Sequence, residues 1–206
     1  MCIRDRYKRL PTDLLHGKTV GIVGFGGNGH RIAAALQTFA GRIIATDCFP
    51  EIDVPEYVDL LPDTELNGLL AESDVIIVTL PLSPSNEQLI GASQFAACKK
   101  GAYFVNVGRG SVVDHEALCD ALESGQLRAA GLDVADPEPI PNDHRLWQLQ
   151  NIIITPHVGA QSPYRVDSST DLFCENLRRY NSGETLLNLV DKQLGFPRPE
   201  HRVSIN

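Results

Sequence analysis

Three side chains that could take part in catalysis lie in separate segments of this 206-residue chain: Arg109, Glu138 and His157. Reduction of a 2-keto acid needs a hydride donor, a proton for the developing alkoxide and a cation that fixes the carboxylate. A histidine titrates near neutrality and suits the proton step, and a carboxylate on its other ring nitrogen fixes the tautomer. The planar guanidinium of an arginine matches a carboxylate with two hydrogen bonds. The three residue types therefore suit acid/base chemistry on a small carboxylic acid.

Each of these residues also has a purely structural interpretation. Arg109 stands in a GRG turn, His157 follows a proline and Glu138 lies in the turn sequence DPEP, so each alone could be an ordinary loop residue. What favours a shared site is that all three follow predicted parallel strands, whose carboxyl ends meet at one edge of a sheet. The other histidines have no such setting, and we expect them on the surface: His16, His30, His115, His144 and His201.

A glycine-rich turn in the stretch VGIVGFGGNGHRIAAAL, residues 20–36, predicts a dinucleotide site. A GxGxxG pattern alone is a weak signal, but this one follows a predicted strand directly and opens a predicted helix. The first glycine then supplies a tight turn, the second lets the backbone approach a pyrophosphate, and the third lets the helix pack on the strand. We expect the cofactor to contact this turn at Gly24, Gly26, Gly27, Asn28 and Gly29.

Asp47 ends the next predicted strand, about 20 residues after the glycines, where a carboxylate accepts hydrogen bonds from the adenosine ribose. A carboxylate there repels a 2′-phosphate, and the following residues CFPE offer no Arg or Lys to pair one. The sequence therefore predicts NAD rather than NADP as the cofactor.

Short apolar runs alternate with helical patterns from Lys18 onward, which predicts an α/β fold with a doubly wound parallel sheet. We expect strands at residues 19–23, 42–46, 75–79, 103–107, 129–134 and 152–155. One helix should follow the glycines and turn Ile32, Ala35, Leu36 and Phe39 inward. A second should start at the N-cap Asp114 and bury Leu118, Ala121 and Leu122, and a third should span 163–181 with Phe173, Leu177 and Tyr180 on one side.

The formal charge of −8 and the scattered basic residues argue against nucleic-acid binding. Five cysteines without a CxxC pair indicate neither a zinc site nor a disulfide framework, and fit a reducing cytoplasm. No apolar run approaches the roughly 18 residues of a membrane span. We expect a single nucleotide-binding domain at 18–183, with an interdomain segment at 1–17 before it and a tail at 184–206 after it. We treat the first residues, MCIRDR, as non-native.

Three segments beyond the glycines, with TLPLSP at 79–84 before them, carry a more specific resemblance: VNVGRGSVVDHEAL (105–118), GLDVADPEP (131–139) and NIIITPHVGAQS (151–162). In this order they resemble the nucleotide-binding domain of the D-isomer-specific 2-hydroxyacid dehydrogenases. The resemblance implies that Arg109 grips the substrate carboxylate, that Glu138 orients a histidine and that His157 is the acid/base. It also implies that Asp133 contacts the nicotinamide end and that Leu80, Val107, Gly108 and Gly159 neighbour the cofactor.

The resemblance implies an NAD-dependent oxidoreductase that acts on a small D-2-hydroxy acid, in a homodimer, with no metal. The sequence departs from the family at Asn28, where Ile or Val is usual, and in length, since most of a substrate domain is missing. We therefore expect little activity from this chain alone. Alternatives are a phosphite- or formate-type dehydrogenase, although formate enzymes have Gln where Glu138 stands, and a non-catalytic NAD-sensing module like the corepressors built on this scaffold. A methyltransferase-type nucleotide site would leave Arg109, Glu138 and His157 unexplained.

Overall fold

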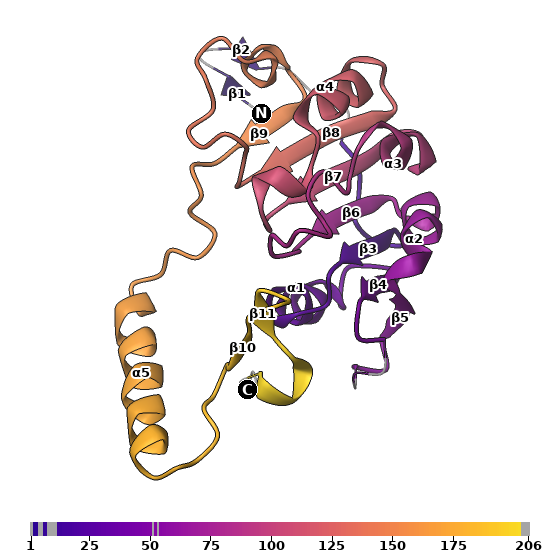
Figure 1. The fold of residues 1–206 in the computed structure, drawn as a ribbon. Helices are drawn as coiled ribbons and strands as arrows, with labels where there is room; N and C mark the ends of the chain where they lie inside the picture. The colour runs from indigo at the N-terminus through magenta and orange to yellow at the C-terminus, as the bar shows by residue number, and fades with distance from the viewer. Residues whose placement is uncertain (1, 4–5, 8–11, 51, 53, 203–206) are drawn as a thin grey trace.

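The computed structural model describes residues 2–3, 6–7, 12–50, 52 and 54–202. Its centre is a seven-stranded sheet in the order β5-β4-β3-β6-β7-β8-β9, with every neighbouring pair parallel (Figure 1). The chain steps outward from β3 to β5 and then returns to β6 on the other side of β3. This confirms the predicted doubly wound sheet and places its switch point between β3 and β6. The strands are β3 (Thr19–Val23), β4 (Arg42–Asp47), β5 (Val58–Pro62), β6 (Val75–Val78), β7 (Ala102–Asn106), β8 (Leu127–Leu132) and β9 (Ile152–Ile154).

Helices cover both faces of this sheet and create two separate cores. On one face lie α2 (Leu66–Glu72), α3 (Ala92–Ala97) and α4 (His115–Glu123), and on the other lies α1 (Gly27–Leu36) (Figure 1). The larger core contains the fully buried Leu69, Phe104 and Leu118, and the smaller one packs Ala33 of α1 on Val20 and Ile22 of β3. Burial on both faces explains why the central strands are continuously apolar.

All six predicted strands are present, with ends within two residues of the expected ones. The sequence missed β5, α2 and α3. The prediction of which α1 residues face inward was partly wrong. Ala33 is buried while Ala35 is exposed. The helix also ends at Leu36, so Phe39 lies outside it and is 57% exposed.

Helix α4 begins as predicted. The Asp114 carboxylate accepts the amide protons of Glu116 and Ala117 at 3.0 and 3.1 Å, which satisfies two amides that lack intrahelical partners. Its predicted inner residues are buried: Leu118, Ala121 and Leu122.

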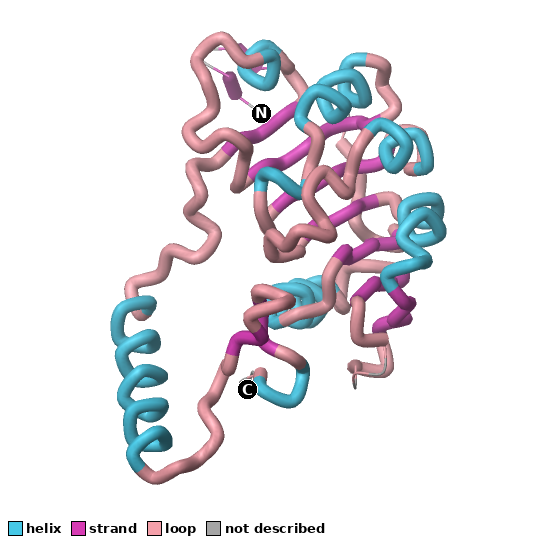
Figure 2. The backbone as a smooth tube through the Cα atoms, in the orientation of Figure 1, coloured by secondary structure: helices cyan, strands magenta, loops and turns pink. Residues whose placement is uncertain are grey.

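Helix α5 (Arg165–Asn181) stands apart from the sheet at the end of a long connection (Figures 1 and 2). The apolar residues predicted on one side of this helix, Phe173, Leu177 and Tyr180, are 65, 50 and 73% exposed. A short antiparallel pair, β10 (Val190–Asp191) and β11 (Phe196–Pro197), follows in the tail and lies beside α1 in Figure 1.

At the amino end, β1 (Cys2–Ile3) pairs with β2 (Arg6–Tyr7), although the sequence indicated no strand there. The rest of the MCIRDR stretch, which the sequence analysis treats as non-native, lies outside the described residues, as do 8–11 and 203–206. Within the described part of the chain, no helix is both long and apolar enough to cross a membrane.

Candidate active site

The glycine turn lies at the switch point and has the shape that a pyrophosphate requires. Gly24 has a φ of +91°, and a Cβ there would lie 2.8 Å from the Leu80 side chain. A Cβ on Gly29 would lie 2.6 Å from the Gly24 carbonyl oxygen, so only glycine lets α1 approach the strand this closely. Gly26 is different, because a Cβ there would meet nothing within 4 Å. The open space beside Gly26 is where a bound phosphate would need the backbone bare.

The first turn of α1 faces the same space. The amide groups of Gly27, Asn28 and Gly29 have no acceptor inside the helix, and the positive end of the helix dipole adds to their attraction for anions. Gly27 and Asn28 are exposed. The residues present therefore fit the pyrophosphate of a dinucleotide.

Asp47 is 7% exposed and already holds two backbone segments together. One carboxylate oxygen accepts the amide proton of Phe25 at 2.8 Å, and the other accepts that of Phe49 at 3.0 Å. The Cys48 thiol also donates to the oxygen that accepts from Phe49, whereas the oxygen that accepts from Phe25 has a further lone pair for a ribose hydroxyl. Asp47 thus fixes the glycine turn to the end of β4 in addition to its predicted role.

The ends of β6 and β7 pack closely beside the turn. A Cβ on Gly108 would lie 2.5 Å from the Leu80 carbonyl oxygen, and the amide of Val107 donates to the Val78 carbonyl at 3.0 Å. Asn106, which the sequence analysis missed, is fully buried, donates to the Arg109 carbonyl at 2.9 Å and accepts from the Gly108 amide at 3.0 Å. Its signal was a polar side chain inside an apolar strand.

Arg109 follows this turn with an exposed side chain, whose Nη1 donates to the Gly108 carbonyl at 2.7 Å. The next residue packs directly on the segment that carries Glu138: a Cβ on Gly110 would lie 1.9 Å from the Ala135 carbonyl carbon. The backbone after β7 therefore fixes the position of the loop after β8.

The hydrogen bond expected between Glu138 and His157 is present. Glu138 Oε2 lies 3.0 Å from His157 Nδ1, while Oε1 accepts the Ala135 amide proton at 3.2 Å. Both side chains are exposed, His157 at 45% and Glu138 at 41%. His157 has a φ of +53°, a left-handed conformation uncommon outside glycine, which is a constraint typical of functional loops.

Asp133 holds the loop that carries His157. Its carboxylate accepts the Thr155 hydroxyl at 2.5 Å and the amides of Val158 and Gly159 at 3.0 and 2.7 Å. Partial burial opposes ionisation, but these hydrogen bonds and the charge of His157 outweigh it and lower the pKa of Asp133. Asp133 is therefore ionised and organises the backbone on both sides of His157.

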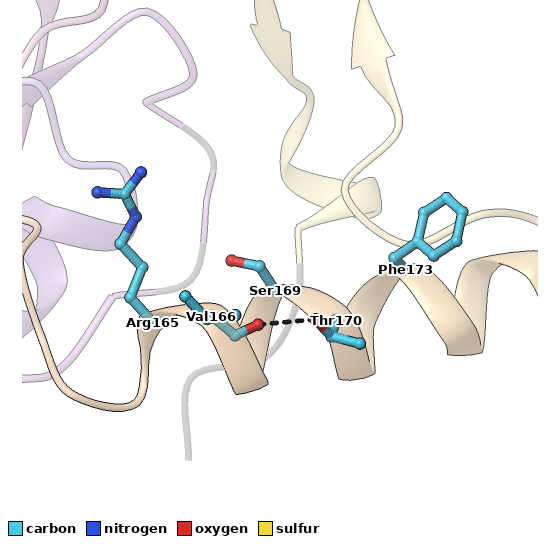
Figure 3. Close-up of a pocket in the computed structure, with 5 residues that line it drawn as sticks. All are labelled: Arg165, Val166, Ser169, Thr170 and Phe173. Atoms are coloured by element: carbon cyan, nitrogen blue, oxygen red, sulfur yellow. Dashed lines mark hydrogen bonds between the residues drawn. The ribbon is translucent and has the colours of Figure 1, made fainter.

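One open groove lies elsewhere, along α5. Figure 3 shows the five residues that line it, with the Thr170 hydroxyl donating to the Val166 carbonyl at 2.9 Å. None of them is a predicted site residue. Among the described residues, no group of three His, Cys, Asp or Glu side chains is placed to hold a metal ion.

Comparison with known proteins agrees with this geometry. The family model described as "D-isomer specific 2-hydroxyacid dehydrogenase, NAD binding domain" matches residues 3–159, most of the chain. The chain belongs to the D-isomer-specific 2-hydroxyacid dehydrogenase family. The matched part of the chain is the family's NAD-binding domain, as the glycine turn and the sheet predicted.

Two relatives show how much of a family member is represented. The chain is 35% identical over 188 residues to D-3-phosphoglycerate dehydrogenase of Methanocaldococcus jannaschii and 34% identical over 191 residues to glyoxylate reductase of Thermofilum pendens. These matches cover 91 and 93% of this chain but only 35 and 56% of those proteins. The chain thus spans about a third of the first relative's length and just over half of the second's.

Solved structures of the family have the same architecture. A D-isomer-specific 2-hydroxyacid dehydrogenase of Xanthobacter autotrophicus Py2, in complex with NADPH and MES, superposes with a TM-score of 0.81 at 34% identity, over 90% of this chain and 76% of that one. D-lactate dehydrogenase of Lactobacillus jensenii with NAD+ superposes with a TM-score of 0.75 at 29% identity, over 88% of this chain and 58% of that one.

Proposed function

We propose that this chain is the NAD-binding part of an oxidoreductase that moves a hydride between nicotinamide and C2 of a small D-2-hydroxy acid or 2-keto acid. The observation that carries the proposal is the 3.0 Å contact between Glu138 and His157. It is made between two loops at the carboxyl edge of the sheet, the same edge as the glycine turn.

In this proposal each residue has one task. His157 gives a proton to the oxygen that develops at C2, or takes it back in the reverse direction, and Glu138 holds the ring through Nδ1 so that Nε2 is left for the substrate. Arg109 pairs with the substrate carboxylate. Bound NAD would supply the hydride acceptor or donor. Asp133 fixes the loop around His157 and, as the resemblance implies, neighbours the nicotinamide.

The proposal is tested by the product formed from hydroxypyruvate. The chain, incubated with NADH over hours because turnover should be slow, is expected to form glycerate of the D configuration. Replacing His157 with Asn should abolish this product, and Glu138→Gln should lower its rate by about 10²-fold, the scale of positioned acid/base catalysis.

Glu123→Gln serves as the matched control, because this exposed carboxylate at the end of α4 pairs with Arg145 and not with a site residue. It should leave the rate unchanged. Product formation at the wild-type rate in both site variants, or formation of the L isomer, would contradict the proposal.

Cofactor choice gives a second prediction. NAD should bind at least about tenfold more tightly than NADP, a difference of about 1.4 kcal/mol, because the Asp47 carboxylate repels a 2′-phosphate. Asp47→Ala should narrow this ratio, measured by calorimetric titration, whereas Asp171→Ala on the exposed face of α5 should not.

The structure adds one cation that the local sequence did not predict. The guanidinium of Arg202, from the tail, lies 6.0 Å from the centre of the ring of Phe49, the residue whose amide donates to Asp47. Equal affinities for NAD and NADP in the wild type would refute the predicted preference. In that event, loss of NADP binding in Arg202→Ala would identify the tail guanidinium as the reason.

A further inference from the structure

His115 is buried, and the expectation that it lies on the surface was wrong. Its exposed fraction is 7%, and it is the first residue of α4. Nδ1 lies 3.1 Å from the main-chain carbonyl oxygen of Asp136. A carbonyl oxygen only accepts hydrogen bonds, so Nδ1 must carry the proton. Nε2 is buried with no hydrogen-bond partner among the described residues.

This tautomer is also the one that the surroundings favour. In the other neutral tautomer, the proton on Nε2 would be a buried donor without a partner, and Nδ1 would face the Asp136 carbonyl as a second acceptor. A second proton, on Nε2 as well as Nδ1, would bury a positive charge, and burial therefore lowers the pKa of His115. His144, whose ring centre is 6.3 Å away, also lowers the pKa of His115, while Asp136 and Asp114 raise it. His115 is thus a neutral, fixed donor aimed at one carbonyl group.

The carbonyl that His115 holds belongs to the loop that carries Glu138. Asp136 lies between Ala135, whose amide donates to Glu138, and Glu138 itself, whose other oxygen contacts His157. On its own side, His115 follows the Asp114 cap and the short turn Gly110–Val112, which begins directly after Arg109. The hydrogen bond therefore joins the segment of the predicted carboxylate-binding arginine to the loop of the predicted acid/base pair.

We propose that His115 is a positioning residue, which holds the Asp136 carbonyl and thereby keeps Glu138 in contact with His157. The inference rests on the proposed function, because it concerns the pair assigned there. His115 does not touch substrate or cofactor. It acts through the backbone of residues 135–138, where the Asp136 carbonyl contacts its Nδ1 and the Ala135 backbone packs closely on Gly110.

The experiment measures imidazole tautomers in the 15N-labelled full chain by long-range 1H–15N correlation at alkaline pH, with His115 and His157 assigned by substitution. His115 in the wild type should carry its proton on Nδ1. His157, whose Nδ1 faces Glu138, should also carry its proton on Nδ1. Glu138→Gln should shift the tautomer of His157 toward the Nε2–H form that predominates in unrestrained histidine.

Two variants of His115 then separate positioning from mere support of the fold. His115→Leu, which removes the donor, should shift His157 toward the Nε2–H form at least half as far as Glu138→Gln does. His115→Asn, whose amide nitrogen stands near the position of Nδ1, should leave His157 as in the wild type. NAD affinity should stay unchanged in both, because the glycine turn is at the other end of the site.

The outcomes distinguish the two proposals. If Glu138→Gln leaves the His157 tautomer unchanged, the acid/base pair of the proposed function fails. If Glu138→Gln shifts it and His115→Leu does not, the positioning role of His115 is overturned while the pair stands. A wild-type His115 with its proton on Nε2 overturns the positioning role without any variant, even if His115→Leu fails to fold.

Discussion

Mixed with NADH and hydroxypyruvate or glyoxylate, this chain should turn over about a thousandfold or more slowly than a complete family member, yet it should bind NAD. The reason lies in the exposure of the site: His157 and Glu138 are 45 and 41% exposed, and Arg109 is exposed as well. Contacts between charged groups in water are weak, and catalysis gains several orders of magnitude from closure that excludes water and aligns the reactants.

Steady-state NADH oxidation, followed beside a calorimetric NAD titration of the same sample, measures both parts of this prediction. The titration is the control, since a sample that binds NAD is folded at the nucleotide site. A rate comparable with that of a full-length relative would show that the described elements already enclose the substrate, and would contradict a site limited by its exposure to water.

Gly26→Ala should separate cofactor binding from folding. A Cβ at this position meets nothing within 4 Å, and the φ of −83° is open to any residue, so the free energy of unfolding should change by less than about 0.5 kcal/mol. NAD affinity should nevertheless fall at least about tenfold, or about 1.4 kcal/mol, because the methyl group occupies the space that the pyrophosphate needs.

Gly125→Ala is the matched control for Gly26→Ala. Gly125 also has open space around it, but its φ is +72°, and it follows α4 away from the glycine turn. Alanine there should cost about 1 kcal/mol of stability from backbone strain and leave NAD affinity unchanged. Tight NAD binding by Gly26→Ala would contradict the assignment of this turn to the pyrophosphate.

The sequence predicted the part of the fold that depends on local pattern. Strands such as β3 and β6 are buried on both faces and therefore read as continuous apolar runs. The edge strand β5 was missed because Val58 is its one buried residue, which leaves a weak apolar pattern. Helices α2 and α3 have seven and six residues, too few to show a helical period.

The contacts that depend on distant parts of the chain were beyond the sequence. His115 is buried because a loop 21 residues away covers it, and no local sequence pattern predicts that contact. Asp47 accepts a hydrogen bond from the Phe25 amide, 22 residues away, and the motif alone did not predict this structural contact. The exposed apolar side of α5 shows a second limit of local pattern. Helical periodicity indicates which side of a helix is apolar, but it does not indicate what packs against that side.

Bound NAD should place its nicotinamide beside His157 and the rest of the cofactor along the glycine turn and Asp47. NMR shift changes on addition of NAD can be compared with those on addition of ADP-ribose, which lacks the nicotinamide. We expect both ligands to shift the amide signals of Gly26 and Phe25, and only NAD to shift the His157 ring and the Gly159 amide. Identical changes at His157 with both ligands, or none with either, would contradict this placement.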